Sequence, residues 1–361
     1  MYKCCHQILH GLCFFDNALV ACCYSPVDQV HNLHPPMIFD NYNGEIIKKD
    51  DLFKRIQPFV DTFKKGKVPL ECGDCFKIEE KVWDEEQYID YITITHFSTC
   101  NANCIYCSNN LTPEERTNNV YKIMPVLNSF KEEGVIRKGV ELHIGGGEFS
   151  IYPEAEELLQ NYSKDNFARI FIPTNAIKYN EFIFNAMDSG STYIIVSLDS
   201  GTRETYKKIK RIDAFDTVIE NLCKYTKTPT ATKRLRLKYI LVPGYNDNVQ
   251  EFKKFLNIAH EFKAKYIKLD IDARYAKLVN FQINKHFELL VHKMQTLAEK
   301  EGFVLDIYSF LEQTLHSLKK PMFPLISNFI AELKFKYSKN EQRRIAELYD
   351  NYYYADRAKN K

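Results

Sequence analysis

Three cysteines, Cys100, Cys104 and Cys107, lie within the stretch STCNANCIYCSNN. Thiolates at this spacing bind metals, but a structural zinc site takes four protein ligands. A Cys-x3-Cys-x2-Cys loop instead suits three irons of a four-iron cubane whose fourth iron stays open to another ligand. The motif therefore predicts a [4Fe–4S] cluster at which chemistry takes place. A zinc ion held by these cysteines and a distant histidine, His96 or His143, is the alternative.

Polar residues also follow two β-branched runs, where strands would end. The run VELHIGG (140–146) leads into Gly147 and Glu148. Glycines let a backbone approach a ligand closely, and a carboxylate can accept hydrogen bonds from an ammonium group. The run TYIIVSLD (192–199) carries Ser197 and Asp199, which are two apart and so share one face of a strand. Their hydroxyl and carboxylate are suitable partners for ribose hydroxyls.

These motifs together resemble the radical S-adenosylmethionine (SAM) superfamily. The stretch CNANCIYC after ITITHFST is similar to the family's cluster loop. The resemblance implies that the amino and carboxylate groups of SAM chelate the open iron, and that the reduced cluster cleaves SAM to a 5′-deoxyadenosyl radical. The cofactor carries this chemistry and the protein positions it.

The resemblance also gives SAM-binding roles to residues outside the cysteine motif. Gly146, Gly147 and Glu148 match the Gly-Gly-Glu motif that faces the SAM amino group, and Tyr106 matches an aromatic position near the adenine. The remaining matches follow the third and fourth strand-like runs, with Asn175 near the ligand and Ser197 with Asp199 at the ribose. For Asn175, an ordinary turn asparagine is an equal alternative.

Asp270 and Asp272 are the candidates for substrate contact or proton transfer. They share one face of the run KYIKLDID (265–272) with Lys268. Three charges on one face would be costly in a dry core, so they are expected to line a polar cavity. Salt bridges at the mouth of a barrel would explain them equally well.

The amino-terminal segment carries a second group of cysteines. Cys4, Cys22, Cys72 and Cys75 are preferred as ligands, although the doublets at 4/5 and 22/23 leave the choice open. The order of cysteine, hairpin turn, cysteine and Cys-x2-Cys resembles the SPASM and twitch modules. The resemblance implies an auxiliary [4Fe–4S] cluster. Two departures are the turn residues Asn17-Ala18 where the family has glycine, and the position before the barrel instead of after it. A zinc knuckle is the alternative.

The pattern of runs predicts the fold. Six β-branched and aromatic runs alternate with helix-length segments between residues 91 and 272. Helical connections favour parallel strands, so the sequence predicts an α/β fold with a partial (β/α)6 barrel. Pro125 and Gly134 predict a helix over 124–133. At the amino terminus, HGLCFFDNALVACCY predicts a hairpin that turns at Asp16-Asn17.

We expect three parts in the chain. Residues 1–88 would form a small Cys-rich hairpin module and residues 89–300 the radical SAM partial barrel. Residues 301–361 would form a strand and helical extension, because the tail reads as an amphipathic helix.

Composition narrows the expected partners. In 361 residues, 49 Lys and Arg face 47 Asp and Glu, so no strong field would attract nucleic acid or an anionic membrane. The sequence has neither a membrane-spanning apolar run nor a signal-peptide pattern, and its cysteines suit a reducing compartment. A cytoplasmic location is expected, with a flavodoxin- or ferredoxin-type reductant implied by the resemblance.

The expected function is hydrogen abstraction from a small molecule, such as a carbohydrate, or from a peptide. An auxiliary cluster would favour an oxidation or dehydrogenation under anaerobic conditions. A peptide-modifying maturase or an epimerase is an alternative, for which Cys223 or a spare amino-terminal thiol would be the hydrogen donor. A non-catalytic iron–sulfur or zinc protein is the alternative of another class.

Overall fold

The computed structural model describes residues 1–22, 36–73, 75, 77–107, 116, 120–272 and 285–307, with only the backbone for 285–288. The predicted helix of the carboxyl-terminal tail and Cys23 lie outside these ranges. The described strands are β1 (Tyr2–Cys4), β2 (Gly11–Phe14), β3 (Ala18–Val20), β4 (Met37–Asp40), β5 (Glu79–Lys81), β6 (Ile89–Ile94), β7 (Ile136–Ile144), β8 (Ala168–Thr174), β9 (Thr192–Ser197), β10 (Leu235–Leu241), β11 (Tyr266–Ile271) and β12 (Val304–Ile307). The described α-helices are α1 (His6–His10), α2 (Lys49–Lys64), α3 (Met124–Glu132), α4 (Ala155–Tyr162), α5 (Glu181–Asp188), α6 (Arg203–Lys210), α7 (Phe215–Tyr225), α8 (Pro229–Thr232), α9 (Val249–Glu261) and α11 (Lys285–Lys300).

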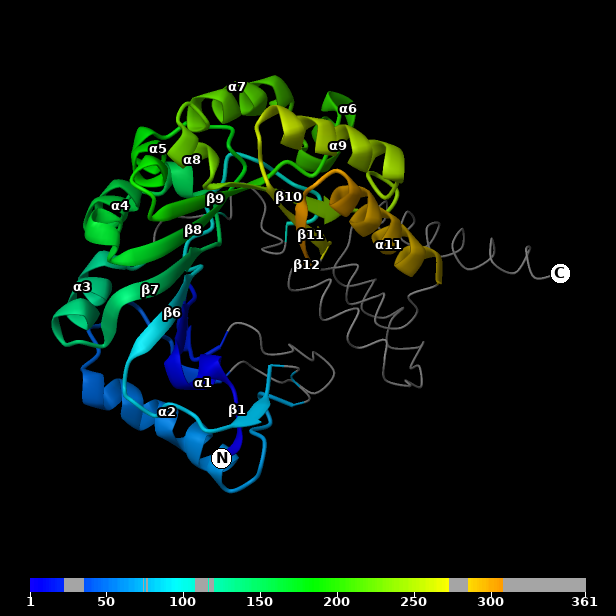
Figure 1. The fold of residues 1–361 in the computed structure, drawn as a ribbon. Helices are drawn as coiled ribbons and strands as arrows, with labels where there is room; N and C mark the ends of the chain where they lie inside the picture. Colours follow the sequence, from blue (N-terminus) through cyan, green and yellow to red (C-terminus); the bar gives the residue numbers. More distant parts are fainter. Residues whose placement is uncertain are drawn as a thin grey trace.

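One large sheet organises the described chain. Its order is β12-β11-β10-β9-β8-β7-β6-β2-β3-β4, with β1 and β5 forming a separate pair. The strands from β12 to β6, and β6 with β2, pair in parallel. The sheet curves, and helices α3 to α9 with α11 follow its outer side (Figure 1). The predicted α/β fold with a mostly parallel sheet is therefore confirmed.

The six predicted strands correspond to β6 through β11. The helix α3 also forms as expected: Pro125 lies in its first turn, where a missing N–H costs nothing, and Gly134 leaves it at φ +65°. Alternation along the strands divides the sheet into two faces. Ile170, Ile172 and Leu237 are buried in the core shared with the helices.

The opposite, inner face of the sheet carries rings and cations. The rings of His143 and Phe171 stack with centroids 4.6 Å apart, and Phe171 and Tyr193 stack at 5.1 Å. The guanidinium of Arg236 lies over Tyr193 at 4.8 Å from its centroid. Because β7 to β10 pair in parallel, these side chains form one row across the four strands. The polar residues of the candidate site follow this row, at the carboxyl ends of the strands.

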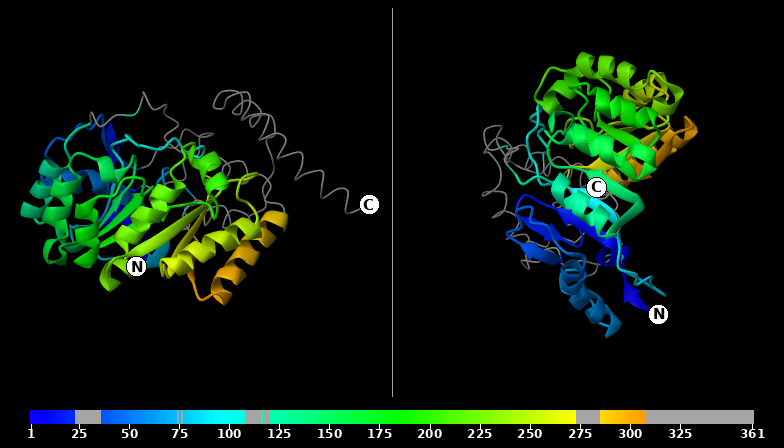
Figure 2. Two further views of the ribbon diagram at one scale, coloured as in Figure 1. Left: turned by 90° about the horizontal axis from the view of Figure 1, so that it is seen from above. Right: turned by 90° about the vertical axis from the view of Figure 1, so that its left-hand side faces the viewer.

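The amino-terminal strands extend the same sheet. β2 and β3 pair antiparallel around Asp16 and Asn17, while β2 also pairs in parallel with β6. Residues of both segments belong to one continuous core, in which the ring centroids of Phe14 and Phe130 lie 6.4 Å apart. The predicted boundary at residue 88 therefore does not separate two cores, because the hairpin adds strands to the edge at β6. Figure 2 shows this segment (blue) at one end of the sheet and α11 (orange) at the other.

No described helix combines the length and apolarity that crossing a membrane requires.

Candidate active site

The cysteine loop lies at the carboxyl end of β6, among the ends of the neighbouring strands. All three thiols, Cys100, Cys104 and Cys107, are half-buried. Burial raises the pKa of the Cys100 thiol to about 11 and also raises that of Cys104. A bound metal would stabilise the thiolate form of these cysteines, which burial otherwise disfavours.

The glycines of the Gly-Gly-Glu motif hold the start of this loop. The Gly147 N–H donates to the Phe97 carbonyl at 2.8 Å, and the Glu148 N–H donates to the Thr99 carbonyl at 2.8 Å. A Cβ on Gly147 would lie 2.1 Å from the Thr99 oxygen, and one on Gly146 would lie 2.3 Å from the Phe97 oxygen. The close backbone approach that these glycines permit is therefore to the cysteine loop, where we expected a ligand.

The Glu148 carboxylate links two strand ends. It is 2% exposed and accepts hydrogen bonds from the Thr174 hydroxyl at 2.6 Å, the Asn175 N–H at 2.7 Å and the Ser150 N–H at 3.1 Å. Each carboxylate oxygen has two lone pairs, so the group retains capacity for one further donor. Its predicted contact with a SAM ammonium remains a prediction.

Asn175 reaches the cysteine loop directly. Its side-chain amide donates to the Cys100 sulfur at 3.6 Å and to the Asn101 oxygen at 2.7 Å. Its own oxygen accepts from the Ile177 N–H at 2.9 Å, which fixes the orientation of the amide. Asn175 is therefore more than a turn residue, because it ties the end of β8 to a candidate cluster ligand.

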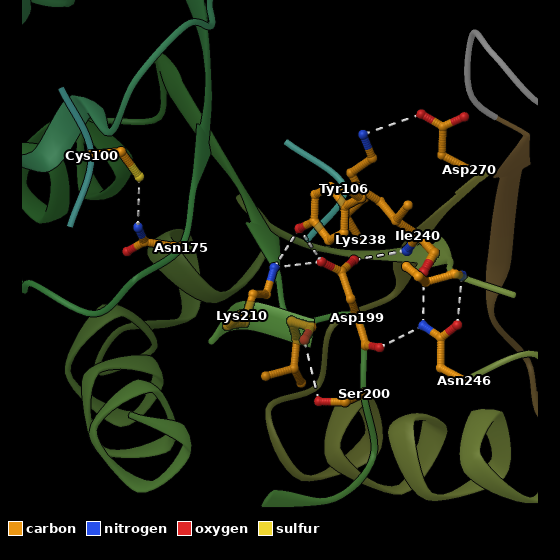
Figure 3. A network of polar contacts seen from close by, with 12 residues as sticks. Cys100, Tyr106, Asn175, Asp199, Ser200, Lys210, Lys238, Ile240, Asn246 and Asp270 are labelled. Atoms are coloured by element: carbon orange, nitrogen blue, oxygen red, sulfur yellow. Dashed lines mark hydrogen bonds and ion pairs between the residues drawn. The ribbon is translucent and has the colours of Figure 1, made fainter. Parts of the chain in front are cut away.

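A buried polar network joins the loop to the end of β9 (Figure 3). One Asp199 oxygen accepts from the Ile240 N–H at 2.7 Å. The other accepts from the Tyr106 hydroxyl at 2.5 Å and from the Lys210 ammonium. The Lys210 ammonium also donates to the Tyr106 hydroxyl, at 2.5 Å. Asp199 is fully enclosed and is therefore engaged by protein groups, whereas Ser197 is half-buried on the inner face.

Sequence reasoning missed two members of this network. Lys210 is wholly buried, and Asn246 donates to the carbonyls of Asp199 (2.8 Å) and Ile240 (2.7 Å). A signal existed for Lys210, which lies four residues after the buried Tyr206 and so shares the apolar face of α6. Asn246 lies in a loop, and its spacing gave no comparable signal.

Tyr106 packs over a small apolar group. Ile105, Ile209, Ile240 and Val242 form a buried cluster against which the Tyr106 ring lies. An apolar surface of this kind suits the predicted adenine contact, which stays a prediction.

The acids at the carboxyl end of β11, Asp270 and Asp272, lie on the inner face. Asp270 is 2% exposed and pairs with Lys238 at 3.2 Å, and Asp272 is also buried. Lys268 pairs with Asp306 at 3.3 Å, and burial lowers the pKa of Lys268. Both interpretations of the acids, salt bridges and substrate contact, are compatible with this placement.

The amino-terminal thiols gather around the β1–β5 pair. Burial raises the pKa of Cys72 above its usual range, and the charges of Cys5, Cys75 and Cys4 raise it further. Burial likewise raises the pKa of Cys5 to about 11, with Cys75 among the contributing charges. Cys22 is buried in the same core. Cys4, Cys5, Cys22 and Cys72 all belong to one buried core, so the choice between Cys4 and Cys5 stays open.

Two observations bear on whether an iron–sulfur cluster fits the loop. Among the described residues, no three His, Cys, Asp or Glu side chains converge on a single ion. Thiolates of a cubane bind separate irons and so need not converge. The Tyr206 hydroxyl, beside Cys104 and Lys210, is buried without a partner in the described structure. A cluster sulfur would supply the acceptor that this hydroxyl lacks.

His96 and His143 are engaged elsewhere. The His96 ring is 3.1 Å from the Tyr152 hydroxyl, and burial lowers its pKa to about 4. His143 stacks on Phe171 and lies 3.2 Å from Glu141. Neither histidine therefore stands beside the three cysteines as a fourth ligand.

Comparison with known proteins decides the family. The family model described as Radical SAM superfamily matches residues 94–258, from the last residue of β6 into α9. An uncharacterised protein of Methanocaldococcus jannaschii is 30% identical over 242 residues, covering 66% of this chain and 68% of that protein. The chain belongs to the radical SAM superfamily.

This radical SAM protein is also similar to a named enzyme and to a solved structure. A GTP 3′,8-cyclase of Clostridium botulinum (strain Langeland) is 22% identical over 242 residues, covering 60% of this chain and 73% of the cyclase. Among solved structures, Streptococcus suis SuiB bound to precursor peptide SuiA superposes with a TM-score of 0.50 at 13% identity, covering 82% of this chain. The match spans 63% of SuiB, less than two thirds of its length, and shows a shared fold.

Membership of the family implies SAM and a [4Fe–4S] cluster as cofactors. The donor set fits this cluster, because the three thiols Cys100, Cys104 and Cys107 lie on one loop after β6.

Proposed function

We propose that this radical SAM enzyme oxidises a small-molecule substrate, such as a carbohydrate, or a peptide. The proposal is supported by a single arrangement. The cysteine loop is held from three sides, by the Gly-Gly-Glu turn, by Asn175, and by the carbonyls of Ile209 and Lys210, which accept from Ile105 at 2.9 Å and Asn103 at 3.3 Å. A loop fixed in this way can orient a cofactor against the inner face of the sheet.

The residues of the protein are proposed to bind SAM, to orient it and to shield it from water. When bound, the reduced cluster and SAM supply a 5′-deoxyadenosyl radical that abstracts hydrogen from the substrate. Glu148 and the Gly146–Gly147 turn are proposed to receive the SAM amino group, Ser197 the ribose, and Tyr106 with its apolar cluster the adenine. Asp199 accepts from Ile240, Tyr106 and Lys210, and it is proposed to contact the ribose together with Ser197 through its remaining capacity.

Asp270 and Asp272 are proposed to accept the proton that an oxidation releases. A two-electron oxidation removes one hydrogen atom, one further electron and one proton from the substrate. SAM would supply the acceptor of the hydrogen atom, and the amino-terminal thiols would hold an auxiliary cluster that accepts the electron. The Asp270 carboxylate lies 3.2 Å from the Lys238 ammonium, on the inner face of the sheet.

The reductant is proposed to be a flavodoxin- or ferredoxin-type protein in the cytoplasm. The sequence has eleven cysteines, more often metal ligands or buried apolar residues than disulfides in a protein of the cytoplasm, which is compatible with this location. An epimerase or a peptide-modifying maturase would use the same site, and the products distinguish these reactions.

The test is anaerobic reconstitution with iron and sulfide, followed by SAM and a strong reductant. We expect 5′-deoxyadenosine to form, and a Cys104→Ala variant to form at least 100-fold less, because one iron loses its ligand. Candidate substrates, including a carbohydrate panel, peptides and GTP, are then compared by the increase in 5′-deoxyadenosine and by substrate mass. A loss of two mass units indicates oxidation, and an unchanged mass with altered configuration indicates epimerisation. A reconstituted protein with intact clusters and no 5′-deoxyadenosine would contradict the proposal.

A further inference from the structure

The ion pair between Lys210 and Asp199 is the most deeply buried charge pair in the described chain for which both exposures are given. The side chains are 1% and 0% exposed. Burying two charges costs free energy that a structural role alone does not require, because apolar residues of similar volume serve as well. The pair stands beside Cys104, and that location gives it a role.

Lys210 contacts the cysteine loop through both its backbone and its side chain. Its carbonyl accepts from the Asn103 N–H, and the preceding Ile209 carbonyl accepts from the Ile105 N–H. Its ammonium donates to the hydroxyl of Tyr106, between the second and third cysteines. The carboxyl-terminal end of α6 is thus bound to the loop on both sides of Cys104.

The same network acts on Cys104 electrostatically. The Lys210 ammonium and the Asp199 carboxylate both contact the hydroxyl of Tyr106, which is two residues after Cys104. The two charges of the ion pair therefore oppose each other at this sulfur. Their effect is strong because water is excluded from the pair.

We propose that Lys210 and Asp199 are positioning residues that set the reduction potential of the cluster at Cys104. The proposal rests on a cluster being bound there, as the family implies. A cluster gains negative charge on reduction, so a nearby cation favours the reduced state and a nearby anion opposes it. Each residue should therefore move the potential in a direction fixed by its sign.

The test compares Lys210→Met and Asp199→Asn in the full chain after anaerobic reconstitution. The reduction potential of the cluster is followed by electron paramagnetic resonance, without SAM or substrate. Lys210→Met removes the cation and leaves the carboxylate, so we expect a more negative potential, with the one-electron equilibrium shifted at least tenfold, or about 59 mV. Asp199→Asn should shift it in the opposite direction. The double variant should lie between the two.

Controls separate this effect from a loss of structure. Lys208→Met alters an exposed lysine of the same helix and should leave the potential unchanged. Lys210→Arg keeps the charge and should stay close to the wild-type potential, so it tests the idea even if Lys210→Met binds no cluster. Iron and sulfide per chain are measured for every variant.

Opposite shifts support the proposal. Shifts of the same sign, or unchanged potentials with full cluster content, would overturn it and leave the enzyme class untouched. A wild-type chain that takes up no cluster would instead count against the proposed function.

Discussion

At the scale of residues, Asn175 makes the most direct contact with a candidate cluster ligand. Its amide donates to the Cys100 sulfur, and hydrogen bonds to ligand sulfurs raise the reduction potential of an iron–sulfur cluster. We expect Asn175→Ala to make the potential more negative. It should also cost about 1 kcal/mol of unfolding free energy for the lost bond to Ile177. Redox titration and chemical denaturation measure the two effects.

Asn101→Ala is the matched control for this variant. It removes the other acceptor of the Asn175 amide and keeps the bond to Cys100. Its potential should therefore equal that of the wild type. An Asn175→Ala protein with full cluster content and an unchanged potential would show that the bond to sulfur has no electrostatic effect.

At the scale of elements, the turn after β7 determines where the cysteine loop starts. Gly147→Ala would place a Cβ 2.1 Å from the Thr99 carbonyl oxygen, which is backbone and cannot rotate away. We expect a loss of about 1–3 kcal/mol in unfolding free energy, as for other overpacked sites, and reduced iron content after reconstitution. Denaturant titration and iron analysis check this.

Gly145→Ala provides the comparison, since its Cβ would lie 3.1 Å from the Thr95 methyl group, which belongs to a side chain. The smaller conflict should leave iron content near the wild-type value. Equal losses in the two variants would mean that the loop tolerates a shift of its backbone.

At the scale of the whole molecule, the amino-terminal thiols Cys4, Cys5, Cys22 and Cys72 belong to the main core, whereas the three thiols of the cysteine loop do not. Because the core does not depend on the loop thiols, replacing Cys100, Cys104 and Cys107 by alanine should leave the amino-terminal site intact. We expect that variant to retain iron and sulfide at the amino terminus after reconstitution. Metal analysis and electron paramagnetic resonance detect it.

A companion variant replaces Cys72 and Cys75 by alanine and should lose this iron while keeping the cluster of the loop. Zinc without iron in the triple variant would refute an auxiliary cluster and favour the zinc knuckle. Retention of this iron by a Cys4→Ala variant and its loss from a Cys5→Ala variant would identify Cys5 as the ligand in place of Cys4.

The sequence by itself determined the six strands from β6 to β11, the helix α3 and the family. These depend on local patterns: β-branched runs, a proline and a glycine at helix ends, and the spacing of three cysteines on one loop. Such signals lie within a few residues of each other, so they can be found without knowing which segments meet.

Only the tertiary structure decided which groups contact the cysteine loop and which contact other parts of the protein. The glycines of the Gly-Gly-Glu motif meet the loop backbone, Asp199 turns both oxygens to protein donors, and Lys210 lies buried beside Cys104. The pairing of β2 with β6 likewise joined two segments that were expected to be separate. These outcomes depend on contacts between residues that are far apart in the sequence. The free-energy cost of a buried charge, for example, depends on the partner that the fold places beside it.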